Sequence, residues 1–300
     1  MYLGINATVP NLSAHINPKL SPADSMKGTI MAKRNRDKST NQSNTNKLTN
    51  RGRGRGTGMN YQPALHIQDV PSKGLVTRIK GWKTGRIHHL MSKLELFYFF
   101  ILEWSTQITD IREQYYLEQE ITLAIAEKLN IHHPTNPRTK KAIVMTSDFV
   151  ITFRTPTGLI DHARTIKYAK DLRSARALEK LEIERLYWKA KGVDWGIVTE
   201  QEIDAVIAEN VKWLHPYRDI VDIAPLSERV ITQLEDPLTS LLLQEALSLR
   251  DITDTCDEQF GLEAGSSLTA MRHLLANRRW LIDLSQPIQP LKTLKLLTRA

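Results

Sequence analysis

A predicted strand hairpin in the middle of the chain restricts the fold more than any other feature. Residues 142–153 alternate apolar and polar side chains, a Pro-Thr-Gly turn follows, and residues 159–168 form the returning strand. Helical patterns flank this hairpin at 92–104 and at 175–191. Because a strand pair buries its apolar face under neighbouring helices, this order predicts an α/β core.

Shorter elements extend this core in both directions. We predict strands at 75–80, 108–117 and 195–198 and a further helix at 120–129. A chain of 300 residues with 41% hydrophobic content has ample apolar surface for such a core. With these elements, the predicted α/β domain covers residues 61–199.

Three charged side chains fall on this core in an order that suits phosphodiester hydrolysis. Glu95 lies on the first helix, Asp148 on the first arm of the hairpin and Lys167 on the second. One or two carboxylates together with a substrate phosphate can bind Mg²⁺, and a neighbouring lysine can orient water or stabilise negative charge. The three residues are therefore candidates for a metal-dependent nuclease site, and Glu184 on the later helix is a candidate supporting carboxylate.

Each candidate also has a purely structural explanation. Glu95 follows Ser92 with the spacing of a helix capping box. Asp148 and Lys167 could form an ordinary ion pair between strands. The pair His88-His89 just before the helix could contact a phosphate or simply pack. The pattern of residues leaves these alternatives open.

The cysteine count and the apolar runs constrain the location of the protein. Cys256 is the one cysteine, so the chain has neither an internal disulfide nor a multi-cysteine zinc site, and a reducing compartment is expected. The longest apolar run, 96–102, is too short to cross a bilayer, and residues 1–20 lack the pattern of a secretion signal. We expect a cytoplasmic protein.

The net charge of +8 is concentrated near the N-terminus. Between Lys27 and Gly58 there are nine basic residues and one acidic residue, and 51–58 alternates arginine with glycine. Such a polar segment cannot bury enough surface to fold alone, so we predict a flexible arm over 1–60. Mobile basic residues gain affinity for a polyanion by counterion release, although a solubilising tail is the alternative. The arm residues expected to contact DNA are Lys33, Arg34, Arg36, Arg51, Arg53 and Arg55.

Beyond residue 200 the pattern is mostly helical. We predict helices at 200–214, 238–249 and 266–276, followed by two short strands at 279–284 and 291–296. Helices followed by a two-strand wing are typical of a winged-helix-like domain, predicted here over 200–300. Its basic cluster, which could contact DNA or a partner, comprises Arg272, His273, Arg278 and Arg279.

Residues 31 to about 215 resemble the TnsA family, the endonuclease subunits of heteromeric cut-and-paste transposases. The resemblance rests on short identities in register rather than on the three charged residues alone. They include Gly56-Thr57-Gly58-Met59-Asn60-Tyr61, Lys83-Thr84-Gly85-Arg86-Ile87-His88-His89-Leu90, Ser92-Lys93-Leu94-Glu95-Leu96, Asp110-Ile111-Arg112-Glu113-Gln114 and Met145-Thr146-Ser147-Asp148-Phe149.

The resemblance implies a restriction-endonuclease-like catalytic domain at 61–199. The catalytic residues of the family fall on Glu95, Asp148 and Lys167. The metal ligands become Glu95, Asp148 and Thr165, where Thr165 stands in place of the usual glutamine. Mg²⁺ is the implied cofactor, with Mn²⁺ able to substitute, and further implied DNA contacts are Arg86, His88 and His89.

The resemblance also implies partners in a bacterial cytoplasm. TnsA-like subunits hydrolyse the strands at the five-prime ends of a transposon, while a recombinase, TnsB, cuts and joins the three-prime ends. An ATP-binding regulator, TnsC, licenses both and contacts the C-terminal domain. Two other functions stay open: a catalytically inactive binding subunit of the same complex, suggested by Thr165, and a stand-alone restriction-type nuclease.

Overall fold

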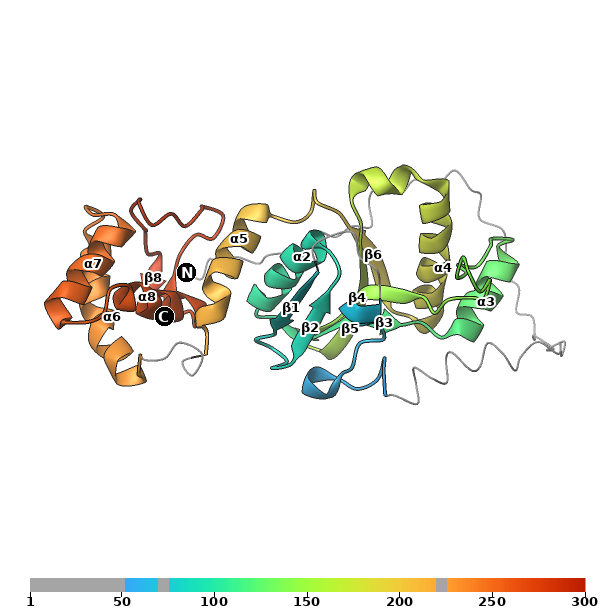
Figure 1. Cartoon of the computed structure of the whole chain (residues 1–300), viewed down its shortest axis with the longest axis horizontal. Coiled ribbons are helices and arrows are strands. Elements are labelled where there is room, and N and C mark those ends of the chain that lie inside the picture. The colour runs from blue at the N-terminus through green and yellow to red at the C-terminus, as the bar shows by residue number, and fades with distance from the viewer. Residues whose placement is uncertain (1–51, 70–75, 220–225, 300) are drawn as a thin grey trace. The chain divides into compact units, whose positions relative to one another are not determined.

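The computed structural model describes residues 52–69, 76–219 and 226–299 (Figure 1). Residues 1–51, which include most of the predicted arm, lie outside the described residues. The same holds for four of the predicted DNA contacts, namely Lys33, Arg34, Arg36 and Arg51.

The chain divides into two compact units. The first comprises the residues up to Leu96 together with Ser105–Glu202, and the second comprises Phe97–Trp104 and Ile203–Ala300. Helix α2 (Lys93–Trp104) therefore contributes its first turn to one unit and its remainder to the other. No helix within the described ranges is both long enough and apolar enough to cross a bilayer.

The first unit is built on a four-stranded sheet in the order β3-β4-β5-β6. Strands β3 (Ile108–Tyr116), β4 (Thr146–Thr155) and β5 (Gly158–Ile166) are antiparallel neighbours, and β6 (Asp194–Val198) runs parallel to β5. The predicted hairpin is confirmed by the β4–β5 pairing, which brings the start of β4 next to the end of β5.

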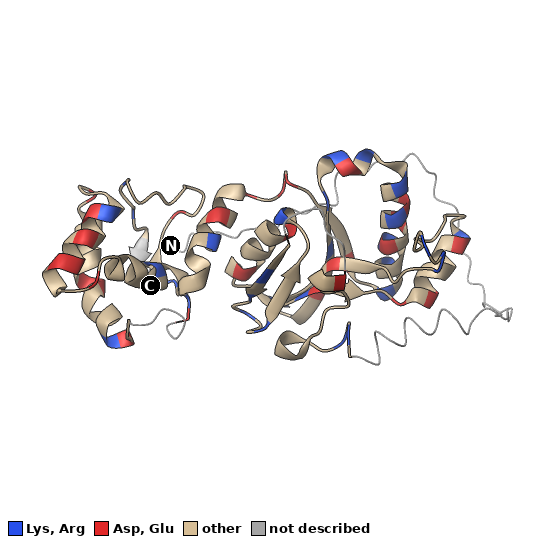
Figure 2. Cartoon of the chain, in the orientation of Figure 1, with Lys and Arg blue, Asp and Glu red and all other residues tan. Residues whose placement is uncertain are grey.

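Helices α3 (Gln119–Lys128) and α4 (Ala175–Lys191) pack together in this unit (Figure 1). Helix α4 has the bounds predicted from sequence because both its ends are marked: the Ser174 side chain accepts a hydrogen bond from Ala177 N, and Gly192 takes the left-handed φ of 69°. Lysine, arginine and acidic side chains alternate along α4 (Figure 2). Its apolar side joins a buried cluster of Leu117, Ala126, Met145, Val150, Ala163, Ile183, Tyr187 and Trp188.

A second, two-stranded sheet precedes α2. Strands β1 (Thr77–Lys80) and β2 (Ile87–Leu90) are antiparallel, and β2 lies against β3. The remaining short elements of this unit are the 3₁₀ turns η2 (Gly58–Asn60), η3 (Ile67–Asp69) and η4 (Ala169–Arg173).

Residues 52–60, predicted as part of the arm, belong to the folded first unit, so the predicted boundary at 60 is corrected for these residues. Arg55 forms a bridge with Gln62, and the backbone N–H of Gly54 donates to Gln62 O at 2.6 Å. A Cβ on Gly54, whose φ is 72°, would lie 2.6 Å from the Cβ of Tyr116. Gly54 of the Arg-Gly run therefore permits close packing on β3, which composition alone did not predict.

The second unit is mostly helical, as predicted. It contains α5 (Ala205–Leu214), η5 (His215–Tyr217), α6 (Glu228–Leu243), α7 (Leu249–Phe260) and α8 (Ser266–Ala276). A ladder of two residues per strand, β7 (Trp280–Leu281) and β8 (Thr298–Arg299), completes it. The predicted strand at 291–296 is wrong because pairing with β7 occurs further along the chain.

The predicted helix at 238–249 is also wrong. Helix α6 begins ten residues earlier and continues through Pro237, and a turn then separates it from α7. Ile231, Leu234, Leu238 and Leu242 are all buried on one side of α6, so their packing outweighs the backbone hydrogen bond that proline removes. The winged-helix architecture stays a prediction, since β7 and β8 form only a short ladder.

Candidate functional site

Asp148 and Lys167 meet where β4 begins and β5 ends. The Lys167 Nζ lies 3.0 Å from Asp148 Oδ2, and the backbone N–H of Ile166 donates to the same oxygen at 2.7 Å. Both donors use Oδ2, which leaves Oδ1 to bind another group. The ion pair that was the structural alternative is thus present, and Asp148 Oδ1 can still bind a metal ion.

Glu95 forms the capping box predicted from its spacing. Its backbone N–H donates to Ser92 Oγ at 3.1 Å, and Ser92 Oγ donates to Glu95 Oε1 at 3.0 Å. The backbone N–H of Met91 donates to Oε2 at 2.9 Å. The side chain is buried, so the cap holds one orientation of the carboxylate in the first turn of α2.

Glu95 lies near enough to Asp148 and Lys167 for their charges to act on its pKa. Burial, followed by the negative charge of Asp148, raises the pKa of Glu95 to about 7, and Lys167 acts in the opposite direction. Burial alone would lower the pKa of Lys167, but Asp148 and the neighbouring carboxylates raise it on balance. Lys167 is therefore an ammonium at neutral pH and cannot take a proton from water.

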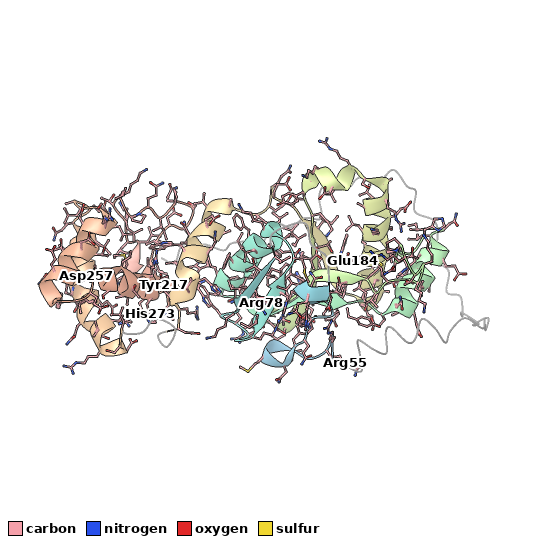
Figure 3. The ribbon with its side chains drawn as sticks, viewed as in Figure 1. Arg55, Arg78, Glu184, Tyr217, Asp257 and His273 are labelled. Carbon is pink, nitrogen blue, oxygen red and sulfur yellow. The ribbon has the colours of Figure 1, made fainter. Side chains whose placement is uncertain are left out.

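Glu184 joins the two strands from the side of α4 (labelled in Figure 3). The hydroxyls of Ser147 and Thr165 both donate to Glu184 Oε1 at 2.5 Å. The indole N–H of Trp188 donates to Ser147 Oγ at 2.7 Å, and that of Trp195 donates to Thr165 Oγ1 at 3.3 Å. Burial, followed by the charge of Asp148, raises the pKa of Glu184 to about 6.

This network gives Thr165 a structural role beside the predicted one. Its hydroxyl donates to Glu184 and accepts from Trp195, which leaves one lone pair on Oγ1, so its role as a metal ligand stays a prediction. Sequence reasoning named Glu184 only as a supporting candidate. A stronger signal was present, because Leu181, Glu184 and Trp188 are spaced three and four residues apart on the buried side of α4.

Arg86 and His88 lie in the interior, which is incompatible with the DNA contacts predicted for them. Arg86 has 9% of its surface exposed and grips Glu113 with both terminal nitrogens, while His88 is fully buried. His88 Nδ1 lies 2.8 Å from Glu113 Oε2, and its Nε2 lies 2.7 Å from Thr84 Oγ1. A carboxylate can only accept, so Nδ1–H donates to Glu113 and, in the neutral ring, Nε2 accepts from Thr84.

Of the other predicted DNA contacts, Arg55 and His89 retain exposed surface. Arg53 is held by Asp69, with a 2.5 Å ion pair, whereas Arg55 is exposed. His89 is half-buried and stacks on His66, with ring centroids 4.6 Å apart.

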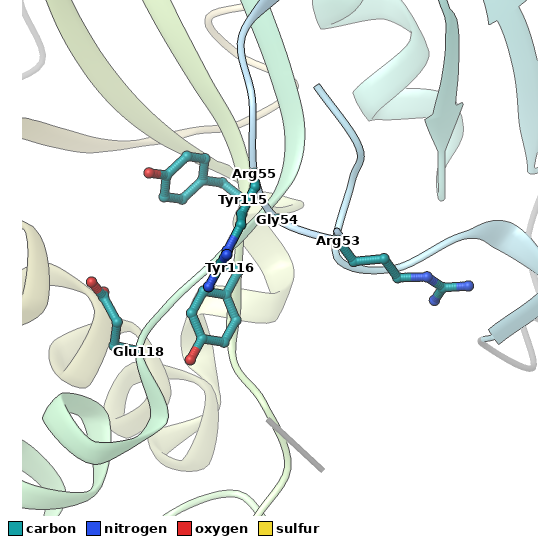
Figure 4. A pocket seen from close by; sticks show the side chains of 6 residues that line it. All are labelled: Arg53, Gly54, Arg55, Tyr115, Tyr116 and Glu118. Atoms are coloured by element: carbon teal, nitrogen blue, oxygen red, sulfur yellow. The ribbon is translucent and has the colours of Figure 1, made fainter. Parts of the chain in front are cut away.

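Arg55 lines a pocket of about 300 Å³ (Figure 4) together with Arg53, Gly54, Tyr115, Tyr116 and Glu118. Tyr116 pairs with Thr146, two residues before Asp148.

The basic cluster predicted in the second unit is largely engaged within that unit. The guanidinium of Arg272 lies 3.8 Å from the Trp213 ring centre and 4.5 Å from that of Tyr217. Arg278 stacks over Trp104 at 4.3 Å. His273 Nδ1–H donates to Tyr217 O at 2.9 Å, and Arg279 forms a 2.7 Å ion pair with Glu228. These contacts stabilise the helices.

Among the residues that the structure describes, no three His, Cys, Asp or Glu side chains are grouped as a ready metal-binding set. Carboxylate oxygens with free capacity include Asp148 Oδ1 and Glu95 Oε1, which accepts only the Ser92 hydroxyl. Two carboxylates fit a hard divalent cation that takes its other ligands from water or a substrate phosphate. The donor set therefore suits Mg²⁺ or Mn²⁺ better than zinc.

Comparison with known proteins identifies the family. Residues 105–200 match the family model described as TnsA-like endonuclease N terminal, and residues 202–284 match that described as TnsA endonuclease C terminal. The chain is 39% identical over 228 residues to the Transposon Tn7 transposition protein TnsA of Escherichia coli. The aligned region covers 75% of this chain and 80% of that protein. The chain belongs to the TnsA endonuclease family.

The two TnsA family models meet where the molecule divides. The N-terminal match ends at residue 200 and the C-terminal match begins at 202, beside the Glu202–Ile203 division between the units. Asp148, Lys167 and Glu184 all lie within the TnsA-like N-terminal match. The sheet that holds Asp148 and Lys167 thus lies within the match to the TnsA-like endonuclease N terminal.

Proposed function

We propose that this protein is the Mg²⁺-dependent DNA endonuclease subunit of a transposase and hydrolyses the strands at the five-prime ends of the transposon. The observation that carries the proposal is the convergence of Glu95, Asp148 and Lys167 in a TnsA-family chain. The relative from Escherichia coli is named for Tn7 transposition, and we extend that role to this chain.

In this proposal the carboxylates of Glu95 and Asp148 bind Mg²⁺, for which Mn²⁺ can substitute. An ion held by these two carboxylates would supply Lewis-acid chemistry, polarising a water molecule and offsetting charge on the scissile phosphate. Lys167, held as an ammonium by Asp148, contributes positive charge beside the phosphate. Glu184 keeps the strands that carry Asp148 and Lys167 at a fixed spacing through Ser147 and Thr165.

The proposed partners follow from the same family relationship. A TnsB-like recombinase would cut the three-prime ends, and a TnsC-like ATPase would contact the second unit. Within the first unit, Arg55 and His89 retain exposed surface for contact with double-stranded DNA. Lys167, just beyond the end of β5, keeps 37% of its side chain exposed, so we propose that DNA approaches this end of the strands.

The test is Asp148→Asn in the full chain, assayed with both partner proteins on labelled transposon ends. We expect five-prime strand cleavage to fall at least about a thousandfold, because the metal loses an anionic ligand. The matched control is Asp194→Asn, a half-exposed carboxylate paired with Arg164 on a neighbouring strand, which should cut normally. Cleavage at the wild-type rate by Asp148→Asn contradicts the proposed site.

Three further outcomes separate the alternatives. Metal-dependent cutting of the five-prime strands only when the partners are present supports the transposase subunit. Specific cutting by the purified protein alone supports a stand-alone nuclease. Assembly with the partners on transposon ends without any five-prime cutting, in either Mg²⁺ or Mn²⁺, supports an inactive binding subunit.

A further inference from the structure

Strand β3 loses its regular alternation at Gln114. The φ of this residue is 48°, in the left-handed region that non-glycine residues rarely adopt. The guanidinium of Arg112 lies over the Tyr115 ring at 5.7 Å, although residues three apart on a regular strand point to opposite faces. The backbone at Gln114 is therefore turned, and the side chains on either side of it change face.

Hydrogen bonds from the segment before β1 hold this turn in place. Tyr61 Oη donates to Glu113 O at 3.0 Å, and the backbone N–H of Ala64 donates to Gln114 O at 3.1 Å. Successive carbonyls of a regular strand point in opposite directions, whereas these two are bound by one short segment. The neighbouring Glu113 side chain is anchored by Arg86, so the left-handed residue sits in a fixed frame.

The irregularity lies directly opposite Asp148. On one side of it Glu113 pairs with Phe149, and on the other Tyr115 pairs with Ser147, in the same register. Gln114 and Asp148 occupy the position between, where the ladder is interrupted. The interruption leaves the start of β4 free to direct Asp148 toward Ile166 N and Lys167 rather than into the β3 ladder.

The turned backbone delivers the Gln114 side chain to Glu95. Its Nε2 donates to Glu95 Oε2 at 3.4 Å, while its Oε1 accepts from the Thr146 hydroxyl at 3.3 Å. An ionised Glu95 carboxylate can only accept, so it fixes the NH₂ end of the amide toward itself, and the Thr146 hydroxyl donates to the other end. Because Met91 N–H also binds Oε2, that oxygen has two donors and Oε1 keeps the free capacity.

We propose that Gln114 is a positioning residue of the nuclease site: its left-handed backbone carries the carboxamide to Glu95 and orients that carboxylate for a divalent cation. The inference rests on the proposed function for the identity of the site. It adds a residue that never contacts the metal or the DNA. A strained backbone kept beside a buried carboxylate is typical of a site where geometry matters more than local stability.

The decisive variant is Gln114→Gly. Glycine adopts a φ of 48° without strain, so the variant keeps the backbone turn and removes only the carboxamide. The matched control is Asn130→Gly, the same kind of change at a φ of 54° just after α3. Both variants should fold with wild-type circular dichroism.

Two measurements read out the role of Gln114. The first is a titration of the full-length protein with Ca²⁺ alone, followed by calorimetry and by the shift in melting temperature. The second is the Mg²⁺ concentration that gives half-maximal DNA cleavage. Residues that orient metal ligands typically change metal affinity ten- to a hundredfold, so we expect Gln114→Gly to weaken Ca²⁺ binding about tenfold and to raise the Mg²⁺ requirement similarly. Asn130→Gly should match wild type in both.

The outcomes separate this inference from the proposed function. If wild type cuts DNA and Gln114→Gly shows the same Ca²⁺ affinity and Mg²⁺ requirement, the inference is overturned and the nuclease stands. If Gln114→Gly binds Ca²⁺ more weakly than wild type but neither the wild type nor any variant cuts DNA, the inference is supported and the nuclease proposal fails. Absence of any Ca²⁺ response in wild type overturns the inference as well.

A second variant covers the case in which Gln114→Gly does not fold. Gln114→Asn retains a residue type that tolerates left-handed backbone, but its amide is one methylene too short to span from Thr146 to Glu95. A roughly tenfold loss of Ca²⁺ affinity in this folded variant supports the inference, and wild-type affinity overturns it.

Discussion

Two clusters of charged residues in the first unit, each built around buried carboxylates or a single buried carboxylate, shift the carboxyl pKa values in opposite directions. We call Arg86, His88 and Glu113 the Glu113 cluster. Burial alone would raise the pKa of Glu113, but hydrogen bonds from Arg86 and the neighbouring His88 lower it to about 2. The protein itself supplies every partner that this carboxylate needs.

The second group, Glu95, Asp148, Lys167 and Glu184, we call the Asp148 cluster. Here burial and the charge of Asp148 raise the pKa of Glu95 to about 7 and that of Glu184 to about 6. Three carboxylates share one lysine, so the cluster carries excess negative charge that a cation from outside can offset. A carboxylate that is fully paired with cationic side chains stabilises the fold. Carboxylates that outnumber their cationic partners can instead bind an external cation and take part in chemistry.

Breaking the Glu113 cluster should have the largest effect on stability. Glu113→Gln leaves the buried guanidinium of Arg86 without an anionic partner, and we expect a loss of about 3–5 kcal/mol in the free energy of unfolding. Urea denaturation at pH 7 measures it. A loss below about 1 kcal/mol would mean that the two clusters do not differ in the way described.

The same variant predicts a pH dependence. Because the pKa of Glu113 is lower in the folded chain than the ordinary value of 4.5, the ionised carboxylate stabilises the fold above pH 4.5. This contribution is lost as the pH falls from 4.5 toward 2. The difference in stability between wild type and Glu113→Gln should therefore shrink over that interval.

Neutralising Glu95 should have the opposite sign. Its pKa is raised to about 7 in the fold, so the carboxyl destabilises the metal-free protein progressively as the pH rises from 4.5 through 7. Glu95→Gln keeps a capping-box side chain and should stabilise the metal-free protein at pH 8 by up to about 3 kcal/mol while abolishing cleavage. Thermal melts in chelator, paired with cleavage assays, test both parts. Equal melting temperatures at pH 8 would contradict the assigned electrostatics.

Glu184→Gln should show a weaker form of the same behaviour. Glutamine retains an oxygen that can accept from Ser147 and Thr165, and the pKa of Glu184 is raised less, to about 6. We expect a gain of about 2 kcal/mol in the unfolding free energy above pH 6. This gain should disappear below pH 4.5, where the carboxyl is protonated in both the folded and the unfolded chain, and its persistence there would contradict the electrostatic explanation.

An exposed ion pair on α4 should give the smallest change in stability. Glu182 and Arg185 lie 2.7 Å apart with both side chains well exposed. Water and salt screen such a pair, so Glu182→Gln should change stability by less than about 0.5 kcal/mol. A larger change would show that charge alone, rather than burial, governs the clusters.

The sequence predicted those features that depend on neighbours along the chain. Ser174 and Gly192 mark the two ends of α4, and the spacing of Ser92 and Glu95 specifies the capping box. The order of the hairpin strands was enough to bring Asp148 and Lys167 together.

Features that depend on distant partners were not predictable in the same way. Arg86 looks like a DNA contact until Glu113, 27 positions later, is seen to bind it in the interior. The same applies to Thr165, whose hydroxyl is held by a helix residue 19 positions away. In the second unit, the helix predicted at 238–249 has other bounds, because the packing of α6 carries the helix through Pro237.

The double use of Glu95 has a consequence for damaged copies of the protein. The carboxylate that would bind the metal is the same one that completes the first turn of α2 through Ser92. If that turn frays, the orientation of Glu95 is lost with it, although Asp148 and Lys167 stay paired on the strands. The proposed metal affinity would therefore depend on how firmly one helix end is closed.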